Sequence, residues 1–202
     1  MQNAFARFLK ARKGLRGVPR YPRKPLDEIL ELLRFTKVKP YIPQDVRLLD
    51  VGAGDGTFLR YLDGHLQSGV GIDSHLTQSV DFGRCHLVPG YFPYDFETNT
   101  TFDIITMMAV AEHIPMDVFP DVADACWKYL KPDGQLIITV QHPRVERLLD
   151  LLKDLQIVEG FSMHEHYGFK PDCLPEIFSR WKLIKRKQWG FRCNNIFIFE
   201  RP

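Results

Sequence analysis

The chain has 202 residues, of which 45% are hydrophobic and 26% are charged, and its formal net charge is +2. This composition is typical of one globular domain with a sizeable core, and it excludes collagen, a coiled coil and wholesale disorder. No apolar run reaches the roughly 18–20 residues that span a bilayer, and the N-terminus lacks the apolar stretch of a secretory signal, so we expect a cytoplasmic protein without a membrane span.

The chain begins with a basic arm. Residues 1–26 hold eight lysines and arginines and no acid, whereas the rest of the chain holds 19 basic and 25 acidic residues. Such an arm can meet nucleic acid, anionic lipid or a phosphorylated substrate, but we favour the simpler interpretation of a solvated face or a flexible terminus. Residues 26–35 then have the apolar spacing of a helix. We therefore expect residues 1–40 to form the arm and a lead-in helix.

An α/β core follows the arm. Residues 46–51 form a short run rich enough in valine and leucine for a buried parallel strand. Similar apolar runs follow at 70–72, 85–88, 104–108 and 136–140. The segments between them are long enough for helices, and this alternation predicts a parallel sheet covered on both faces. The last two runs, 181–189 and 191–199, can pair as a hairpin, so we expect residues 41–202 to form the main domain.

The sharpest motif is a glycine turn within residues 49–59, whose sequence is LDVGAGDGTFL. Three alternating glycines are unfavourable unless the backbone must approach a ligand. At the carboxyl end of a first strand, such a turn lets main-chain N–H groups and a helix N-terminus face a nucleotide-like molecule. The spacing G-x-G-x-G differs from the dinucleotide fingerprint, in which the third glycine comes one position later.

A second signal is the acid at the end of the next predicted strand. Asp73 lies 19 positions after Gly54, close to the roughly 20 expected for an acid that binds a ribose. A carboxylate at this place accepts both hydroxyls of a ribose. A lone aspartate here can instead be a helix N-cap, but its combination with the glycine turn favours a nucleoside.

With these motifs, residues 40–145 resemble the class I S-adenosylmethionine-dependent methyltransferases of the small-molecule type. Four family motifs occur in order, which are the glycine turn of 49–56, the ribose acid in 71–73, the fourth strand at 102–106 and the turn of 130–136 into the fifth strand. The resemblance implies an α/β fold with a doubly wound, mostly parallel, seven-stranded Rossmann-like sheet and an antiparallel last strand. It also implies methyl transfer with S-adenosylmethionine as the cofactor.

The resemblance assigns the first cofactor-binding residues. Gly52, Gly54 and Gly56 would line the amino-acid part of S-adenosylmethionine. Asp50 would help to hold its ammonium group, and Asp73 would bind its ribose.

The adenine contact departs from the family pattern. Many relatives have an aspartate after the glycine at the end of the third strand, where this chain has Gly90 and Tyr91. Tyr91 or Phe92 would stack on the base instead, although an aromatic pair here is as often plain packing. Met107 and Met108, which end the fourth predicted strand, complete the set of cofactor-binding candidates.

Two histidines are candidates for a catalytic base. Residues 111–113 (Ala-Glu-His) resemble the Glu-His pair behind the fourth strand of many small-molecule methyltransferases, which would place His113 near the transferable methyl group. His142 follows the fifth predicted strand, whose end shares the carboxyl edge of the sheet. Methyl transfer from a sulfonium chiefly needs alignment, and a base is added when the nucleophile is a hydroxyl. The alternative for His113 is a residue that only caps or packs the next helix.

We expect no metal site. The His164-x-His166 pair lacks a third ligand at a distinctive spacing, and the four cysteines contain no CxxC pair. Residues 142–180, rich in His, Phe and Pro, are interpreted as an insertion or lid that selects the acceptor.

The acceptor is expected to be a small or sugar-like molecule, methylated at oxygen, because this insertion is too short for a recognition domain. One alternative is an RNA methyltransferase that uses the basic arm. The other is a non-catalytic module that only binds the cofactor. The sequence leaves the oligomeric state open.

Overall fold

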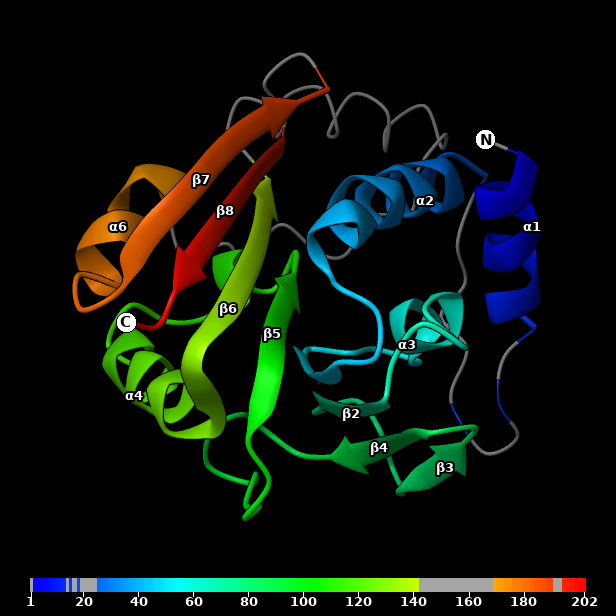
Figure 1. Ribbon diagram of the computed structural model, residues 1–202, viewed down its shortest axis with the longest axis horizontal. Helices are drawn as coiled ribbons and strands as arrows, with labels where there is room; N and C mark the ends of the chain where they lie inside the picture. Colours follow the sequence, from blue (N-terminus) through cyan, green and yellow to red (C-terminus); the bar gives the residue numbers. More distant parts are fainter. Residues whose placement is uncertain (1, 14, 16–17, 19–24, 142–168, 191–193) are drawn as a thin grey trace.

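An eight-stranded sheet organises the chain (Figure 1). The computed structural model describes residues 2–13, 15, 18, 25–141, 169–190 and 194–202. The strands are β1 (Arg47–Val51), β2 (Ser68–Asp73), β3 (Val80–Phe82), β4 (Cys85–Pro89), β5 (Phe102–Met108), β6 (Leu130–Gln141), β7 (Lys182–Trp189) and β8 (Asn194–Glu200). The helices are α1 (Gln2–Ala11), α2 (Pro25–Val38), α3 (Thr57–Tyr61), α4 (Phe119–Tyr129) and α6 (Leu174–Ile177), with the 3-10 helices η1 (Lys39–Tyr41), η2 (Ala111–His113) and η5 (Pro171–Cys173).

The strand order creates a switch point in the middle of the sheet. Across the sheet the order is β3-β4-β2-β1-β5-β6-β8-β7, and the strands from β4 to β6 are parallel. Val51 of β1 pairs with Ile72 of β2 on one side and with Met107 of β5 on the other. Strands β2, β4 and β3 therefore lie on one side of β1, and strands β5, β6, β8 and β7 lie on its other side. Ligands of doubly wound sheets bind beyond the carboxyl ends of the strands at such a point.

The predicted doubly wound, mostly parallel sheet with an antiparallel last strand is confirmed, because β8 runs antiparallel between β6 and β7. The expected number of strands was one too low. Residues Val80–Phe82 fold back on β4 through Gly83, which has a φ of 53°. A strand of three residues carries too little alternation to be recognised from sequence alone.

Strand β6 includes the segment that was expected to be a turn. Leu130 already pairs with Phe102, and the register shifts between Phe102 and Ile104 of the partner strand. Asp133 takes a left-handed conformation with a φ of 60°. The irregular pairing lets the ladder continue through this segment, so the family motif of residues 130–136 lies inside a strand.

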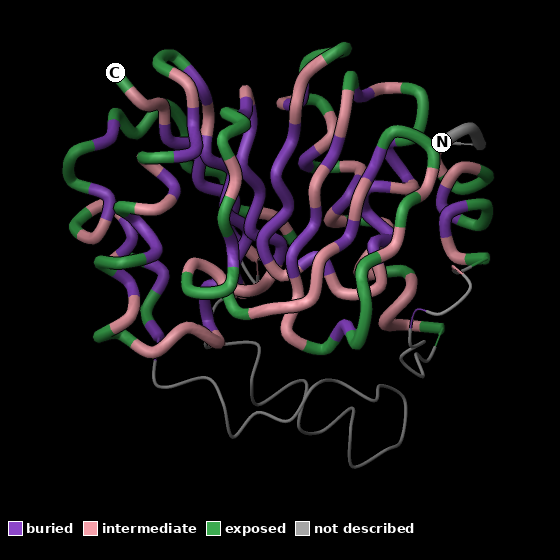
Figure 2. The backbone as a smooth tube through the Cα atoms, turned by 90° about the horizontal axis from the view of Figure 1, so that it is seen from below, coloured by how far each residue is buried: buried purple, intermediate pink, exposed green. Residues whose placement is uncertain are grey.

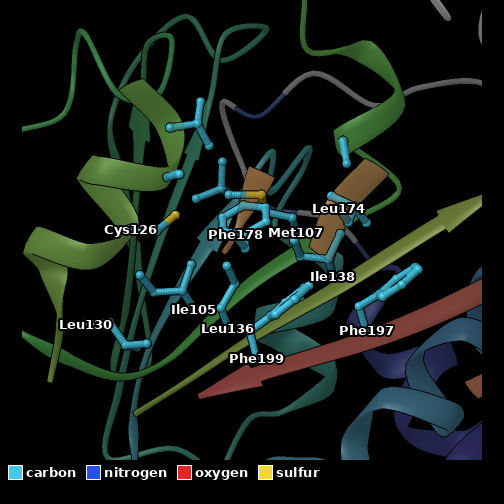
Figure 3. Packing of buried hydrophobic residues seen from close by; sticks show 14 of the residues in the cluster. Ile105, Met107, Cys126, Leu130, Leu136, Ile138, Leu174, Phe178, Phe197 and Phe199 are labelled. Carbon is cyan, nitrogen blue, oxygen red and sulfur yellow. The ribbon is translucent and has the colours of Figure 1, made fainter. Parts of the chain in front are cut away.

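The central strands are buried (Figure 2), and their apolar residues alternate between two cores, one on each face of the sheet. On β5, Ile105 belongs to the core that contains α4 and α6, and Ile104 belongs to the core that contains α1, α2 and α3. Figure 3 shows the first of these cores, to which Met107 of β5 and Phe197 and Phe199 of β8 belong. The central strands are therefore buried on both faces, as near-continuous apolar runs predict, whereas β7 at the edge is exposed.

Residues from the expected basic arm form α1, which packs on the domain (Figure 1). Phe8 is only 1% exposed, and its ring lies 5.9 Å from that of Phe35 on α2. The ring of Phe35 lies 4.8 Å from that of Phe58 on α3. Helices α1 and α2 therefore pack around the helix that follows the glycine turn. None of the described helices is long and apolar enough to cross a bilayer.

Candidate functional site

The glycine turn between β1 and α3 requires glycine at three positions. Gly52, Gly54 and Gly56 have φ angles of 71°, 56° and 76°, a left-handed region that other residues avoid. A Cβ on Gly52 would lie 2.3 Å from a methyl carbon of Val110, and one on Gly56 would lie 2.8 Å from a methyl carbon of Leu87. At these two positions the protein itself fills the space, so the glycines let the turn pack closely.

Gly54 differs from its two neighbours in the turn. A Cβ added there would meet no protein atom within 4 Å. Its N–H points instead toward β2 and donates a hydrogen bond of 2.8 Å to Oδ2 of Asp73. The open space beside a left-handed glycine fits a cradle for the amino-acid part of S-adenosylmethionine. Gly52, Gly54 and Gly56 remain the predicted residues along this part of the cofactor.

Asp73 closes the turn from the end of β2. Oδ2 accepts the Gly54 N–H, and Oδ1 accepts the N–H of His75 at 2.9 Å. The Asp73 side chain is 12% exposed. Nδ1 of the His75 ring also lies 3.2 Å from Oδ1. Because each carboxylate oxygen has two acceptor sites, Oδ2 keeps one for a ribose hydroxyl. The structure thus brings Asp73 to the glycine turn, and Asp73 remains the predicted ribose ligand.

Asp50 is a buried acid in the strand beneath the turn. Its side chain is surrounded by protein, and its Oδ1 accepts a hydrogen bond of 2.6 Å from the Thr106 hydroxyl on β5. The pKa of Asp50 is raised to about 7, because burial raises it more than the Thr106 hydrogen bond lowers it, and the nearby Asp73 carboxylate adds to the rise. A cationic ligand group nearby would favour the ionised form. Asp50 therefore remains the predicted partner of the cofactor's ammonium group.

The chain bends sharply after β5, and this bend brings Val110 against the glycine turn. Ala109 has a φ of 58°, which is unfavourable for a residue with a Cβ, and its N–H donates to the Thr139 carbonyl at 2.9 Å. Val110 then lies against Gly52. The next residues form η2, in which the His113 N–H donates to the Val110 carbonyl at 2.9 Å. The backbone of His113 is thus tied to Val110, the residue that packs on the turn.

Glu112, which sequence analysis named only as part of the Glu-His pair, is buried in the candidate site. It is 4% exposed, and Oε1 accepts a long hydrogen bond of 3.5 Å from the N–H of Gln141 at the end of β6. Its Oε2 has no hydrogen-bond partner among the described residues. The pKa of Glu112 is raised to about 7, because burial raises it more than backbone hydrogen bonds and the positive charge of Arg34 on α2 lower it. The Glu-His pair was the only available signal, because burial depends on the surrounding fold.

The remaining cofactor candidates lie in different surroundings. Tyr91 is 68% exposed beyond β4 and is available for stacking. Phe92 packs against Phe96, with 5.8 Å between ring centroids. Met107 is fully buried in the core of α4 and α6 (Figure 3), so a cofactor contact would fall to its backbone. Met108 lies in the opposite core and is 9% exposed.

Several predicted residues cannot be placed in this site. His142 lies outside the described residues, as do His164, His166 and most of the expected lid of 142–180. Within the part of the chain that is described, no group of three or more His, Cys, Asp and Glu side chains is arranged to hold a metal ion.

Comparisons with known proteins point to one family. A family model described as a methyltransferase domain matches residues 17–177. Among solved structures, the N-methyltransferase NodS from Bradyrhizobium japonicum WM9 has a TM-score of 0.64 and 16% identity, covering 87% of this chain and 98% of that chain. The complex of that enzyme with S-adenosyl-l-homocysteine has a TM-score of 0.60 and 15% identity, covering 100% of this chain and 97% of that chain.

A third similar structure comes from a complex. A chain of the complex between the Haloferax volcanii Trm112 methyltransferase activator and the putative methyltransferase has a TM-score of 0.62 and 12% identity, covering 90% of this chain and 100% of that chain. At such identities the solved structures show a shared fold. A search of curated proteins found no match.

Removing the Asp73 carboxylate should weaken S-adenosylmethionine binding. Asp73→Ala removes the predicted ribose contacts and the bond to Gly54, and we expect a loss of about 1.5–3 kcal/mol, typical of charge-assisted hydrogen bonds. Calorimetry measures the affinity, and Asp124→Ala, on a surface carboxylate, is the matched control. Unchanged affinity in Asp73→Ala would refute the ribose assignment.

A side chain on Gly54 should block the cofactor without meeting the protein. Gly54→Val introduces strain at a φ of 56° and fills the open space beside the turn, so we expect binding of S-adenosylmethionine to be abolished. Gly64→Val is a matched control, because Gly64 has a φ of 73° and equally open surroundings in the loop after α3. If Gly54→Val binds as well as Gly64→Val, the cradle is assigned wrongly.

The buried Asp50 should make the ligand-free protein less stable as the pH rises. Its pKa of about 7 in the folded chain exceeds the roughly 3.9 of an unfolded aspartate, so the folded state binds more protons in this window. The free energy of unfolding then falls between about pH 4 and pH 7 through this group. We expect Asp50→Asn to flatten this fall in urea titrations, while Asp81→Asn, on an exposed carboxylate, retains it. Equal slopes in wild type and Asp50→Asn would contradict the argument.

Proposed function

The chain belongs to the class I S-adenosylmethionine-dependent methyltransferases, and on this basis we propose that it methylates a small or sugar-like acceptor at a hydroxyl oxygen. The observation that carries the proposal is the bend at Ala109, which packs Val110 against Gly52 and leads into η2, whose last residue is His113. A proton acceptor at this place suits a nucleophile that must lose a proton. We also propose that the reaction takes place in the cytoplasm, the compartment expected from the sequence.

The proposed mechanism depends on alignment and one proton transfer. S-adenosylmethionine supplies a methyl group that is activated by a positively charged sulfur. The glycine turn and Asp73 hold the donor side, and η2 offers His113 to the acceptor side. When bound, this donor would give its methyl group to the acceptor oxygen and would keep the electron pair of the broken carbon–sulfur bond on sulfur. The imidazole of His113 takes the hydroxyl proton as the bond forms.

The contacts of α1 favour this proposal over an RNA methyltransferase. Arg7 donates to the Asp63 carbonyl at 2.8 Å, the Lys10 ammonium lies 3.7 Å from the Asp63 carboxylate, and Arg12 pairs with Glu28 of α2. These basic residues contact the protein itself, which reduces the charge that they offer to a phosphate backbone. RNA binding that weakens steeply with salt and is lost on deletion of residues 1–24 would support the alternative.

A labelled-methyl screen of small hydroxyl compounds with the purified protein tests the proposal. Transfer to a hydroxyl oxygen is the expected result. Transfer only to RNA would support the basic arm as the acceptor-binding region, and transfer to an amine nitrogen, the chemistry in the name of NodS, would correct the acceptor atom. Cofactor binding without transfer to any acceptor in a cell extract would favour the non-catalytic module.

His113→Ala should slow methyl transfer to the acceptor by roughly 10²–10⁴-fold, as expected for loss of a general base, and leave cofactor affinity nearly unchanged. Single-turnover rates with the acceptor from the screen measure the effect. His142→Ala is the companion variant, because both histidines are predicted at the carboxyl edge. A large effect in His142→Ala with none in His113→Ala would transfer the role of base to His142.

A further inference from the structure

The buried Arg60 of α3 joins the glycine turn to helix α1. Its side chain is 9% exposed. Nε donates to the carbonyl of Ala11 at 2.5 Å, Nη1 donates to the carbonyl of Asp55 at 2.6 Å, and Nη2 donates to the hydroxyl of Thr57 at 2.9 Å. One planar guanidinium therefore satisfies acceptors from two segments that are far apart in the sequence.

In the glycine turn, Arg60 binds Asp55, the residue between the left-handed Gly54 and Gly56. The Asp55 carbonyl belongs to the same peptide group as the N–H of Gly56, which itself donates to the Ala53 carbonyl at 2.9 Å. The Asp55 carboxylate accepts the N–H of Thr57 at 3.1 Å and the Thr57 hydroxyl at 2.5 Å. Asp55 is thus held through both its backbone and its side chain. This restraint limits the rotation of the peptide groups that frame the open space at Gly54.

At its Nε, Arg60 binds a backbone carbonyl at the C-terminal end of helix α1. Ala11 is the last residue of α1, where backbone carbonyls have no partner within the helix. Ala11 is 2% exposed, and Phe8 one turn earlier is buried against Phe35. The packing of α1 therefore determines whether Arg60 finds its third acceptor.

We propose that Arg60 is a positioning residue for the cofactor and that, with α1 docked, it holds the glycine turn in the shape that binds S-adenosylmethionine. A buried guanidinium is stable only when its donors are satisfied, so loss of the Ala11 acceptor favours its reorientation away from Asp55. Lysine cannot replace Arg60, because its single ammonium nitrogen cannot donate to the three separated acceptors that the three guanidinium nitrogens reach. The role concerns the methyl donor alone and does not depend on the proposed acceptor.

The first test measures binding of S-adenosylhomocysteine, the demethylated product, by calorimetry. We expect Arg60→Lys and Thr57→Val to bind roughly 10–100-fold more weakly, as is typical for loss of a hydrogen bond to a charged group. Thr57→Ser keeps the hydroxyl and should bind as wild type. Arg180→Lys, in the surface pair with Asp124, is the matched arginine control and should also bind as wild type.

The free energy of unfolding without ligand separates positioning from general stability. If Thr57→Val and Thr57→Ser have similar free energies of unfolding, Thr57→Val should still bind S-adenosylhomocysteine more weakly than Thr57→Ser. Wild-type affinity in Thr57→Val would overturn the proposal, and so would equal losses in the valine and serine variants. The Thr57 pair decides the matter if Arg60→Lys does not fold.

The second test uses the reciprocity of coupled equilibria. If docking of α1 favours the ligand, the ligand must favour docking of α1 by the same factor. Hydrogen exchange in residues 2–11 should therefore slow when wild type is saturated with S-adenosylhomocysteine, and should slow less in Arg60→Lys or Thr57→Val. Exchange in α1 that is unchanged by the ligand would overturn the link between α1 and the turn.

Discussion

The hydrogen bond from the Gly54 N–H to the Asp73 carboxylate is the interaction on which the candidate site depends. It joins the turn after β1 to the end of β2, and it can form only because these parallel strands are neighbours that end at the same edge. The left-handed φ of Gly54 turns the N–H toward the acid and leaves open space on its Cα. This contact of 2.8 Å therefore depends on the strand order, on the backbone conformation of the turn and on the carboxylate of Asp73.

Buried negative charge is the second theme of the site. Asp50 and Glu112 are enclosed by protein, and each has a raised pKa because burial disfavours the ionised carboxylate. A methyl donor that carries an ammonium and a sulfonium would offset this penalty. Burial of these acids therefore destabilises the ligand-free protein at the place where its cationic cofactor is expected. Loss of stability in favour of ligand binding is common at functional sites.

The parts of the site that sequence predicted are those encoded locally. The glycine turn and Asp73 have spacings that backbone geometry demands, and the structure brings them together. Arg60 escaped notice because its key acceptor is a backbone carbonyl 49 residues away, which no side-chain pattern reveals. The core position of Met107 depends on which face of β5 meets α4, and the short strand β3 depends on pairing with β4. Such features arise from tertiary contacts rather than from local preference.

The place of β8 in the sheet has a consequence for biosynthesis. The strand that comes last in the sequence lies between β6 and β7, and it pairs with both along its whole length. While a ribosome is still translating the segment before residue 194, these two strands each have an edge without a partner, and the interior residues Phe197 and Phe199 do not yet exist. Closure of the sheet must therefore wait until β8 has been synthesised, and until then the edges of β6 and β7 are open to wrong pairing.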